Sequence, residues 1–145
     1  MFTSVNSRAA AAYRRIAAET SVMAADPHQL VSLLFDALLR HIASARGSLE
    51  RGDIAGKGQA IGKAVRILEE GLKAGLNMAE GGQIASNLHG LYSYSVVRLT
   101  HANLHNDTTA LDEVRQLIEP IAQSWKLIKD QPISAASQPT PVSGA

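Results

Sequence analysis

The sequence lacks several features that would assign a function directly. It has no cysteine, which excludes disulfides, thiolate metal ligands and cysteine nucleophiles. With two Phe and one Trp, it offers no aromatic platform for stacking nucleic-acid bases. Its 14 basic and 13 acidic side chains give a net charge of +1, so we expect no nucleic-acid partner. No apolar run approaches the ~20 residues needed to cross a bilayer, so we expect no membrane insertion.

Motifs for catalysis are also missing. There is no Gly-x-Ser-x-Gly elbow, and Gly81-Gly82 lacks the Lys-Ser/Thr pair of a phosphate loop. His101 and His105 have the four-residue spacing of a metal-chelating pair, but Asp107 or Asn106 would have to supply a third ligand. Two histidines on a solvated helix face are the simpler interpretation. We therefore expect no enzyme and no cofactor, and a metal-dependent bundle enzyme is the alternative.

Hydrophobic periodicity predicts an all-α protein. Within residues 26–49, Asp26 is suited to cap a helix, Pro27 fits its first position, and apolar residues then recur three or four apart. This helix should be buried on two sides. Three further helices follow after short connections, with Asp53 and Asp107 as caps, which indicates an antiparallel up-down four-helix bundle. The predicted bundle occupies residues 26–130, with helices at about 27–50, 54–76, 84–105 and 108–129.

Two of these helices carry residues that disfavour helix formation. The segment 54–76 contains five glycines, each costing up to ~1 kcal/mol relative to Ala. Either this helix frays near its start, or its small residues allow another helix to approach closely. Pro120 lies inside the fourth helix and removes one backbone N–H, so we expect a kink there.

The two ends of the chain differ in composition from the bundle. Residues 1–25 are predicted to form an N-terminal arm with a short helix at about 8–19, docked through Tyr13 and Ile16. Its alanines and arginines also suit a mitochondrial transit peptide, but we favour the amphipathic arm and a cytosolic protein. The tail, 131–145, has three prolines and no periodicity, so we expect it to be disordered.

The bundle has more apolar surface than its core requires. The first and third bundle helices each carry more than one stripe, and Tyr94, Val97 and Leu104 lie well off the main face of the third. A surplus of this kind usually marks a partner surface. The N-terminal arm, a second copy of the chain or an amphipathic client helix could cover it. Alternatively, these side chains are lightly exposed and have no function.

An ordered set of short motifs resembles a known protein family. In chain order, the motifs are Asp26-Pro27-His28-Gln29-Leu30, Leu33-Leu34-Phe35-Asp36, Gly52-Asp53-Ile54-Ala55-Gly56-Lys57-Gly58, Gly71-Leu72-Lys73-Ala74-Gly75-Leu76, Gly81-Gly82-Gln83-Ile84-Ala85, Asn87-Leu88, Leu91-Tyr92, Arg98-Leu99, Ala102-Asn103-Leu104 and Trp125-Lys126. Together they resemble the flagellar secretion chaperones of the FliS family, over residues 12–129 and without long gaps. No single motif is diagnostic, but their order is.

The resemblance implies a function and a partner. Members of this family hold the disordered C-terminal segment of monomeric flagellin in the bacterial cytosol, which prevents premature polymerisation and keeps flagellin competent for type III flagellar export. The resemblance also implies that the arm around Tyr13 contributes to recognition of the export gate, and Ile16 lies one turn further on. The alternative is a homodimeric helical-bundle adaptor that uses the same apolar face.

The client groove is predicted from three helices. Its proposed residues are Leu38, Ile42, Ile61, Val65, Leu68, Tyr94 and Val97. For each of them, packing in the core is the competing interpretation. The family pattern usually has Gly at the position of Ala37, and an acidic residue and Met at Ser93 and Ser95. These departures lie near the centre of the bundle, so the family's client contacts are not transferred residue by residue.

Overall fold

The computed structural model describes residues 26–128, and this part of the chain consists of helices joined by short turns. In chain order, the elements are α2 (Pro27–Glu50), α3 (Ile54–Arg66), the π-helical segment η1 (Ile67–Lys73), α4 (Met78–His105) and α5 (Thr108–Leu127). The predicted arm, with Tyr13 and Ile16, and the predicted tail lie outside the described residues.

Each of the three predicted N-caps is present. The Asp26 carboxylate accepts a hydrogen bond from the Gln29 backbone N–H at 2.8 Å, and Pro27 occupies the first turn of α2. The Gln29 side chain accepts from the Asp26 N–H in return, which completes a capping box. The Asp53 side chain accepts from the Gly56 N–H at the start of α3, and the Asp107 side chain accepts from the Thr109 and Ala110 N–H groups at the start of α5. These caps satisfy N–H groups that have no partner within the helix.

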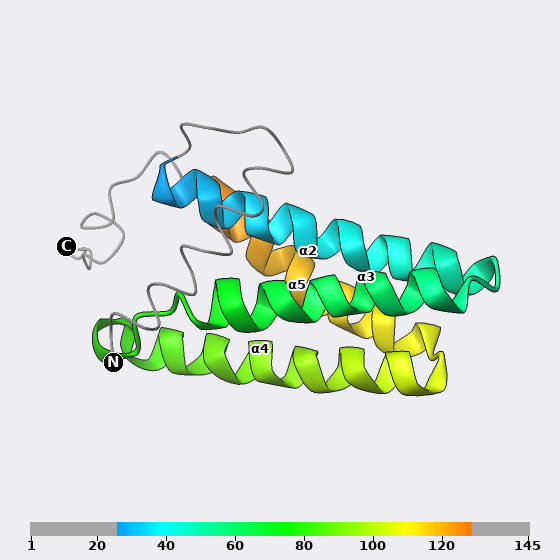
Figure 1. The fold of residues 1–145 in the computed structure, drawn as a ribbon. Coiled ribbons are helices and arrows are strands. Elements are labelled where there is room, and N and C mark those ends of the chain that lie inside the picture. Colours follow the sequence, from blue (N-terminus) through cyan, green and yellow to red (C-terminus); the bar gives the residue numbers. More distant parts are fainter. Residues whose placement is uncertain (1–25, 129–145) are drawn as a thin grey trace.

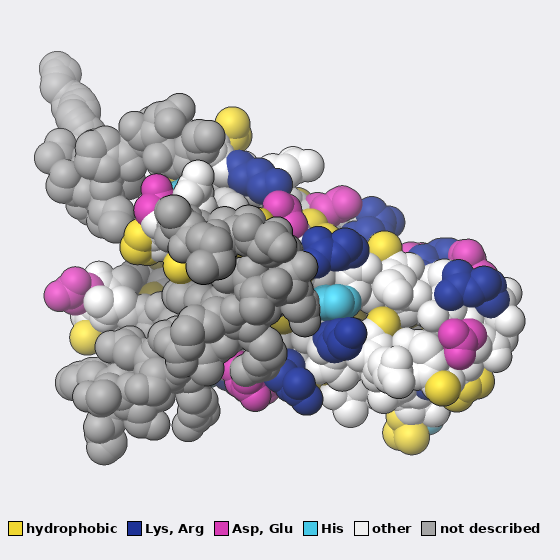
Figure 2. All heavy atoms as spheres, turned by 45° about the horizontal axis from the view of Figure 1, so that its top comes forward, with side chains coloured by type: hydrophobic (Ala, Val, Ile, Leu, Met, Phe, Trp, Pro, Cys, Tyr) yellow, Lys and Arg dark blue, Asp and Glu magenta, His cyan; other side chains and the backbone are white. Residues whose placement is uncertain are grey.

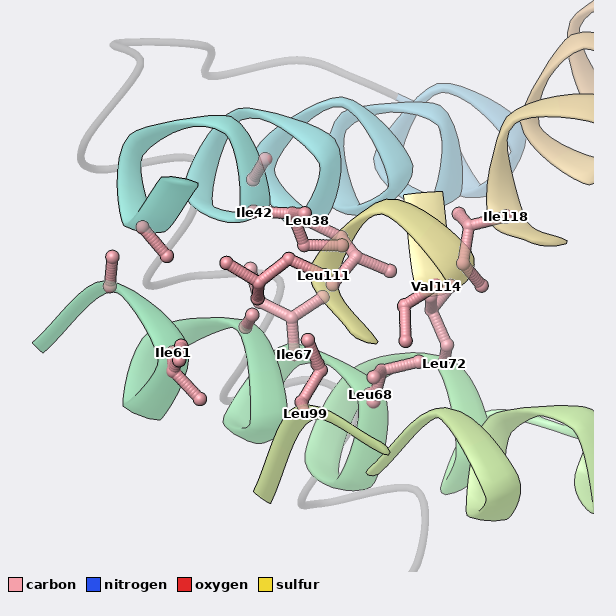
Figure 3. Packing of buried hydrophobic residues seen from close by; sticks show 14 of the residues in the cluster. Leu38, Ile42, Ile61, Ile67, Leu68, Leu72, Leu99, Leu111, Val114 and Ile118 are labelled. Carbon is pink, nitrogen blue, oxygen red and sulfur yellow. The ribbon is translucent and has the colours of Figure 1, made fainter. Parts of the chain in front are cut away.

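The helices form a four-helix bundle with alternating direction (Figure 1). α2 packs against α3 and α5, and α4 packs against the same two neighbours from the opposite corner. Within residues 26–128, the backbones of α2 and α4 do not come close to each other, and neither do those of α3 and α5, so these pairs lie on the diagonals. The predicted all-α bundle is therefore confirmed. Aliphatic side chains from all four sides meet in the centre, as Figure 3 shows for Leu38, Leu68, Leu99, Leu111 and Ile118.

The start of α4 differs from the sequence prediction. α4 begins at Met78, six residues before Ile84, because the Asn77 side chain caps the helix there by accepting from the Glu80 N–H at 3.0 Å. Gly82 then interrupts this helix with φ 57°, a left-handed conformation that glycine adopts without strain. Most of the segment between the predicted helices 54–76 and 84–105 is thus helical, and the chain turns at residues 74–77.

The predicted helix 54–76 is divided into α3 and the wider η1 segment. α3 starts at Ile54, directly after its cap, so it does not fray at its start. A Cβ on Gly62 would meet no atom within 4 Å, so this glycine does not serve close approach of another helix. α5 continues through Pro120 as one helix, and the kink stays a prediction.

Ser95 carries a buried polar atom that makes no hydrogen bond in the described part of the chain. Its Oγ is fully buried and has no hydrogen-bond partner, and it is the one such side-chain atom among residues 26–128. Because an unpaired buried hydroxyl opposes folding, we expect Ser95→Ala to raise the free energy of unfolding by about 1 kcal/mol. Urea denaturation measures this change. Ser93→Ala, on the partly exposed side of α4, is the control, and an equal gain there would contradict the explanation.

Candidate functional site

The outer surface of α4 exposes large apolar side chains in a regular row. Tyr94 is 44% exposed, Val97 64% and Leu104 75%. Together with the exposed Gly90 and the partly exposed His101, they recur at alternating spacings of four and three residues, which places them on one side of the helix. We call Gly90, Tyr94, Val97, His101 and Leu104 the α4 stripe. Apolar side chains also gather at the lower right of Figure 2, where α4 meets α5.

The structure separates the predicted groove residues into two groups. Leu38, Ile42, Ile61 and Leu68 are buried members of the core, and Figure 3 shows them between the helices. Val65 is partly buried and packs against this core. They are buried because α2, α3 and η1 turn their apolar sides toward one another. That these five side chains contact a client stays a prediction.

Tyr94 and Val97 are the predicted groove residues that reach the surface. The other five lie in the core or against it, and that all seven line one client groove stays a prediction. Leu104 was not among the predicted contacts, although it is the most exposed apolar residue of α4. Its position well off the buried face of its helix was the available signal. Of the predicted surplus on two helices, α4 shows large exposed apolar side chains and α2 shows none.

Hydrogen bonds to one carboxylate hold Tyr94 in place. Its hydroxyl donates to Glu113 Oε2 at 2.5 Å, and Arg98 Nε donates to Glu113 Oε1 at 2.7 Å. The hydrogen bonds from the Tyr94 hydroxyl and from Arg98 both lower the pKa of the Glu113 carboxyl, and the one from Tyr94 has the larger effect. The same hydrogen bond raises the pKa of Tyr94. One side chain of α5 thus binds two residues of α4, one of them in the stripe.

The neighbouring acidic residue ties α5 to the opposite side. Arg46 of α2 donates to both Asp112 oxygens, from Nε at 2.7 Å and from Nη2 at 3.1 Å. This bidentate contact lowers the pKa of Asp112 and raises that of Arg46. Asp112 thus binds α2 while Glu113 binds α4, so the two adjacent carboxylates connect α5 to both of its neighbours.

A buried lysine secures the C-terminal turn of α4. Lys57 Nζ donates to both the backbone oxygen and the side-chain Oδ1 of Asn103, each at 2.7 Å. Helix C-terminal carbonyls lack partners within the helix and carry partial negative charge, so an ammonium group there is favourable. This contact anchors the turn that presents Leu104.

The far end of the bundle is closed by a reciprocal contact. The His28 and Trp125 rings stack with centroids 4.6 Å apart. His28 Nε2 donates to the Trp125 carbonyl at 2.7 Å, and Trp125 Nε1 donates to the His28 carbonyl at 3.0 Å. The start of α2 and the end of α5 are thereby held together.

The histidine pair on α4 does not assemble a metal centre. His101 Nε2 lies 3.3 Å from Asp107 Oδ2, and the His101 and His105 ring centroids are 4.5 Å apart. No group of three His, Cys, Asp or Glu side chains within residues 26–128 is arranged to hold a metal ion. The described helices are also too short or too polar for any of them to span a membrane.

Comparison with known proteins shows which family the sequence matches. Residues 9–132 match the family model described as flagellar protein FliS. The chain is 48% identical over 117 residues to the flagellar secretion chaperone FliS of Salmonella typhimurium, covering 81% of this chain and 87% of that protein. It is 42% identical over 113 residues to the flagellar secretion chaperone FliSB of Pseudomonas aeruginosa, covering 78% and 89%.

The matched residues include all four helices of the bundle. A third relative, the flagellar secretion chaperone FliS of Escherichia coli, is 41% identical over 115 residues, covering 79% of this chain and 85% of that protein. The chain therefore belongs to the FliS family, a family of flagellar secretion chaperones and not of enzymes.

Proposed function

We propose that the protein binds the disordered C-terminal segment of monomeric flagellin in the bacterial cytosol, with the α4 stripe as the docking surface. Binding prevents premature polymerisation and keeps flagellin competent for type III flagellar export. The observation that carries the proposal is the exposed row of Tyr94, Val97 and Leu104 on a bundle of this family. Apolar side chains at this spacing suit an amphipathic helix that lies along α4.

The energetics of such a complex agree with release at the export machinery. A disordered segment that folds on binding typically buries ~1,000–3,000 Å² and loses ~2–5 kcal/mol or more to ordering. The resulting complex is specific but separable without ATP. The buried residues Leu38, Ile42, Ile61 and Leu68 would then affect client binding indirectly, through the shape of the core.

The stripe can be tested without disturbing the core. Because Val97 and Leu104 are exposed, glutamate at both positions should leave the fold intact but place unpaired charges in the interface. We expect Val97→Glu/Leu104→Glu to weaken binding of the flagellin from the same organism about 100-fold, measured by isothermal titration calorimetry. Gln116→Glu/Gln123→Glu, on exposed positions of α5, adds the same charge and should bind normally.

Truncated flagellin separates the client segment from the rest of the protein. Removing its last ~40–50 residues, about the length that lines the bundle twice, should abolish the one-to-one complex on size exclusion. Unchanged binding of truncated flagellin would contradict the proposed client segment. Unchanged binding by the stripe variant would contradict the proposed surface.

A homodimer is the second candidate, because the alternating spacing of the stripe is also that of a helix–helix seam. Light scattering of the unmutated protein distinguishes the two, since a dimer requires a mass that doubles at micromolar concentration and returns to the monomer value in Val97→Glu/Leu104→Glu.

We further propose that residues around Tyr13 and Ile16 serve the export gate. Deleting residues 1–18 should then leave flagellin binding unchanged or strengthen it.

A further inference from the structure

Tyr94 differs from the other large side chains of the α4 stripe because it is tied to a second helix. Val97 and Leu104 project from α4 alone, whereas the Tyr94 hydroxyl reaches Glu113 on α5. A free surface tyrosine samples several rotamers and loses that freedom when a partner packs on it. A tyrosine that is already fixed loses less, so its ring contributes more to binding.

Glu113 is itself well placed for such a role. Arg98, one helical turn after Tyr94, donates to the other carboxylate oxygen, so the carboxylate cannot rotate away from the tyrosine without breaking a 2.7 Å contact. Asp112, the preceding residue, binds Arg46 on α2 instead and makes no hydrogen bond to Tyr94. The contacts that reach the exposed ring on α4 are therefore those of Glu113.

From this geometry we infer that Glu113 is a positioning residue, which holds the Tyr94 ring in the orientation that receives the client. The inference rests on the proposed function of the α4 stripe. Glu113 does not need to touch the client, because it acts through the Tyr94 hydroxyl. Its removal should leave the ring in place on α4 but free to rotate, so that ordering it becomes part of binding.

Three variants isolate this role. Glu113→Gln removes the charged acceptor, and Tyr94→Phe removes the hydroxyl but keeps the ring. Each should weaken binding of the C-terminal flagellin peptide by about tenfold, since in Glu113→Gln the Tyr94 hydroxyl and Arg98 compete for one amide oxygen. The double variant should be no weaker than Tyr94→Phe alone, because the contact is already absent in that variant. Asp112→Asn is the matched control, since it breaks the neighbouring α5–α2 ion pair without touching Tyr94, and it should bind normally.

A spectroscopic measurement checks the contact independently of binding. Ultraviolet titration should show that the pKa of Tyr94 moves back toward its ordinary value in Glu113→Gln but not in Asp112→Asn. Urea denaturation of each variant shows whether lost binding merely follows lost folding.

The outcomes separate this inference from the proposed function. If Val97→Glu/Leu104→Glu loses binding while Glu113→Gln and Tyr94→Phe bind normally, the positioning role is wrong and the docking surface stands. Equal weakening by Glu113→Gln and Asp112→Asn also contradicts the inference, because it points to general loss of helix packing. If the stripe variant itself binds normally, the surface is wrong and the positioning role fails with it.

Discussion

Leu38→Ala should lower the free energy of unfolding by about 2–5 kcal/mol, the range found when a buried leucine is truncated. Leu38 is fully buried and contributes to the contact between the neighbouring helices of the bundle (Figure 3). The loss combines the transfer of its methyl groups with the cavity that a close-packed interior cannot fill. Urea denaturation followed by circular dichroism at 222 nm measures the change directly.

Arg40→Ala is the control for this prediction, because Arg40 lies two residues away on the same helix but is exposed. It should change the free energy of unfolding by no more than about 0.5 kcal/mol. A Leu38→Ala protein with normal stability and lost flagellin binding would restore Leu38 as a direct client contact. Lost stability with normal binding, measured where the variant is still folded, would assign it to the core alone.

Raising the pH should destabilise the bundle through Tyr92. Burial raises the pKa of Tyr92 to about 12, from 10.0 in an unfolded chain. Below pH 10 both states keep the proton, so Tyr92 has no effect on the pH dependence. Between pH 10 and 12 the unfolded chain ionises while the folded chain does not, so the free energy of unfolding falls, by about 3 kcal/mol at most.

The Tyr92 contribution is separated from that of other groups by Tyr92→Phe. Lysines also titrate in this range, but they are common to both proteins. Guanidinium or urea unfolding at pH 9 and pH 11.5 should therefore show a smaller loss for Tyr92→Phe than for the unmutated chain. Equal losses would mean that Tyr92 ionises in the folded bundle as it does in water.

The sequence was sufficient for the architecture because local signals and hydrophobic spacing agree. Each of the three capping residues, Asp26, Asp53 and Asp107, stands directly before a segment whose apolar residues recur at helical spacing. The exposure of Tyr94 and Val97 was also predictable, since both lie off the main apolar face of their helix. These properties depend on one helix at a time.

Properties that depend on pairs of helices were not predictable in the same way. Leu38 and Leu68 have the character of either a core or a groove, and only the position of the facing helices buries them. The contact between Tyr94 and Glu113 joins two helices whose relative rotation no periodicity specifies. The π-helical segment Ile67–Lys73, which contains the buried Gly71, was likewise not indicated by helix propensity.

The reciprocal hydrogen bonds between His28 and Trp125 hold the start of the first bundle helix, α2, beside the end of the last, α5. Residues 26 and 128 are consequently neighbouring attachment points, so a domain fused at one of them stands beside the other. The covalent order of the helices is then exchangeable. A circular permutant that joins these two points and opens the turn between α2 and α3 keeps every interhelical contact described above.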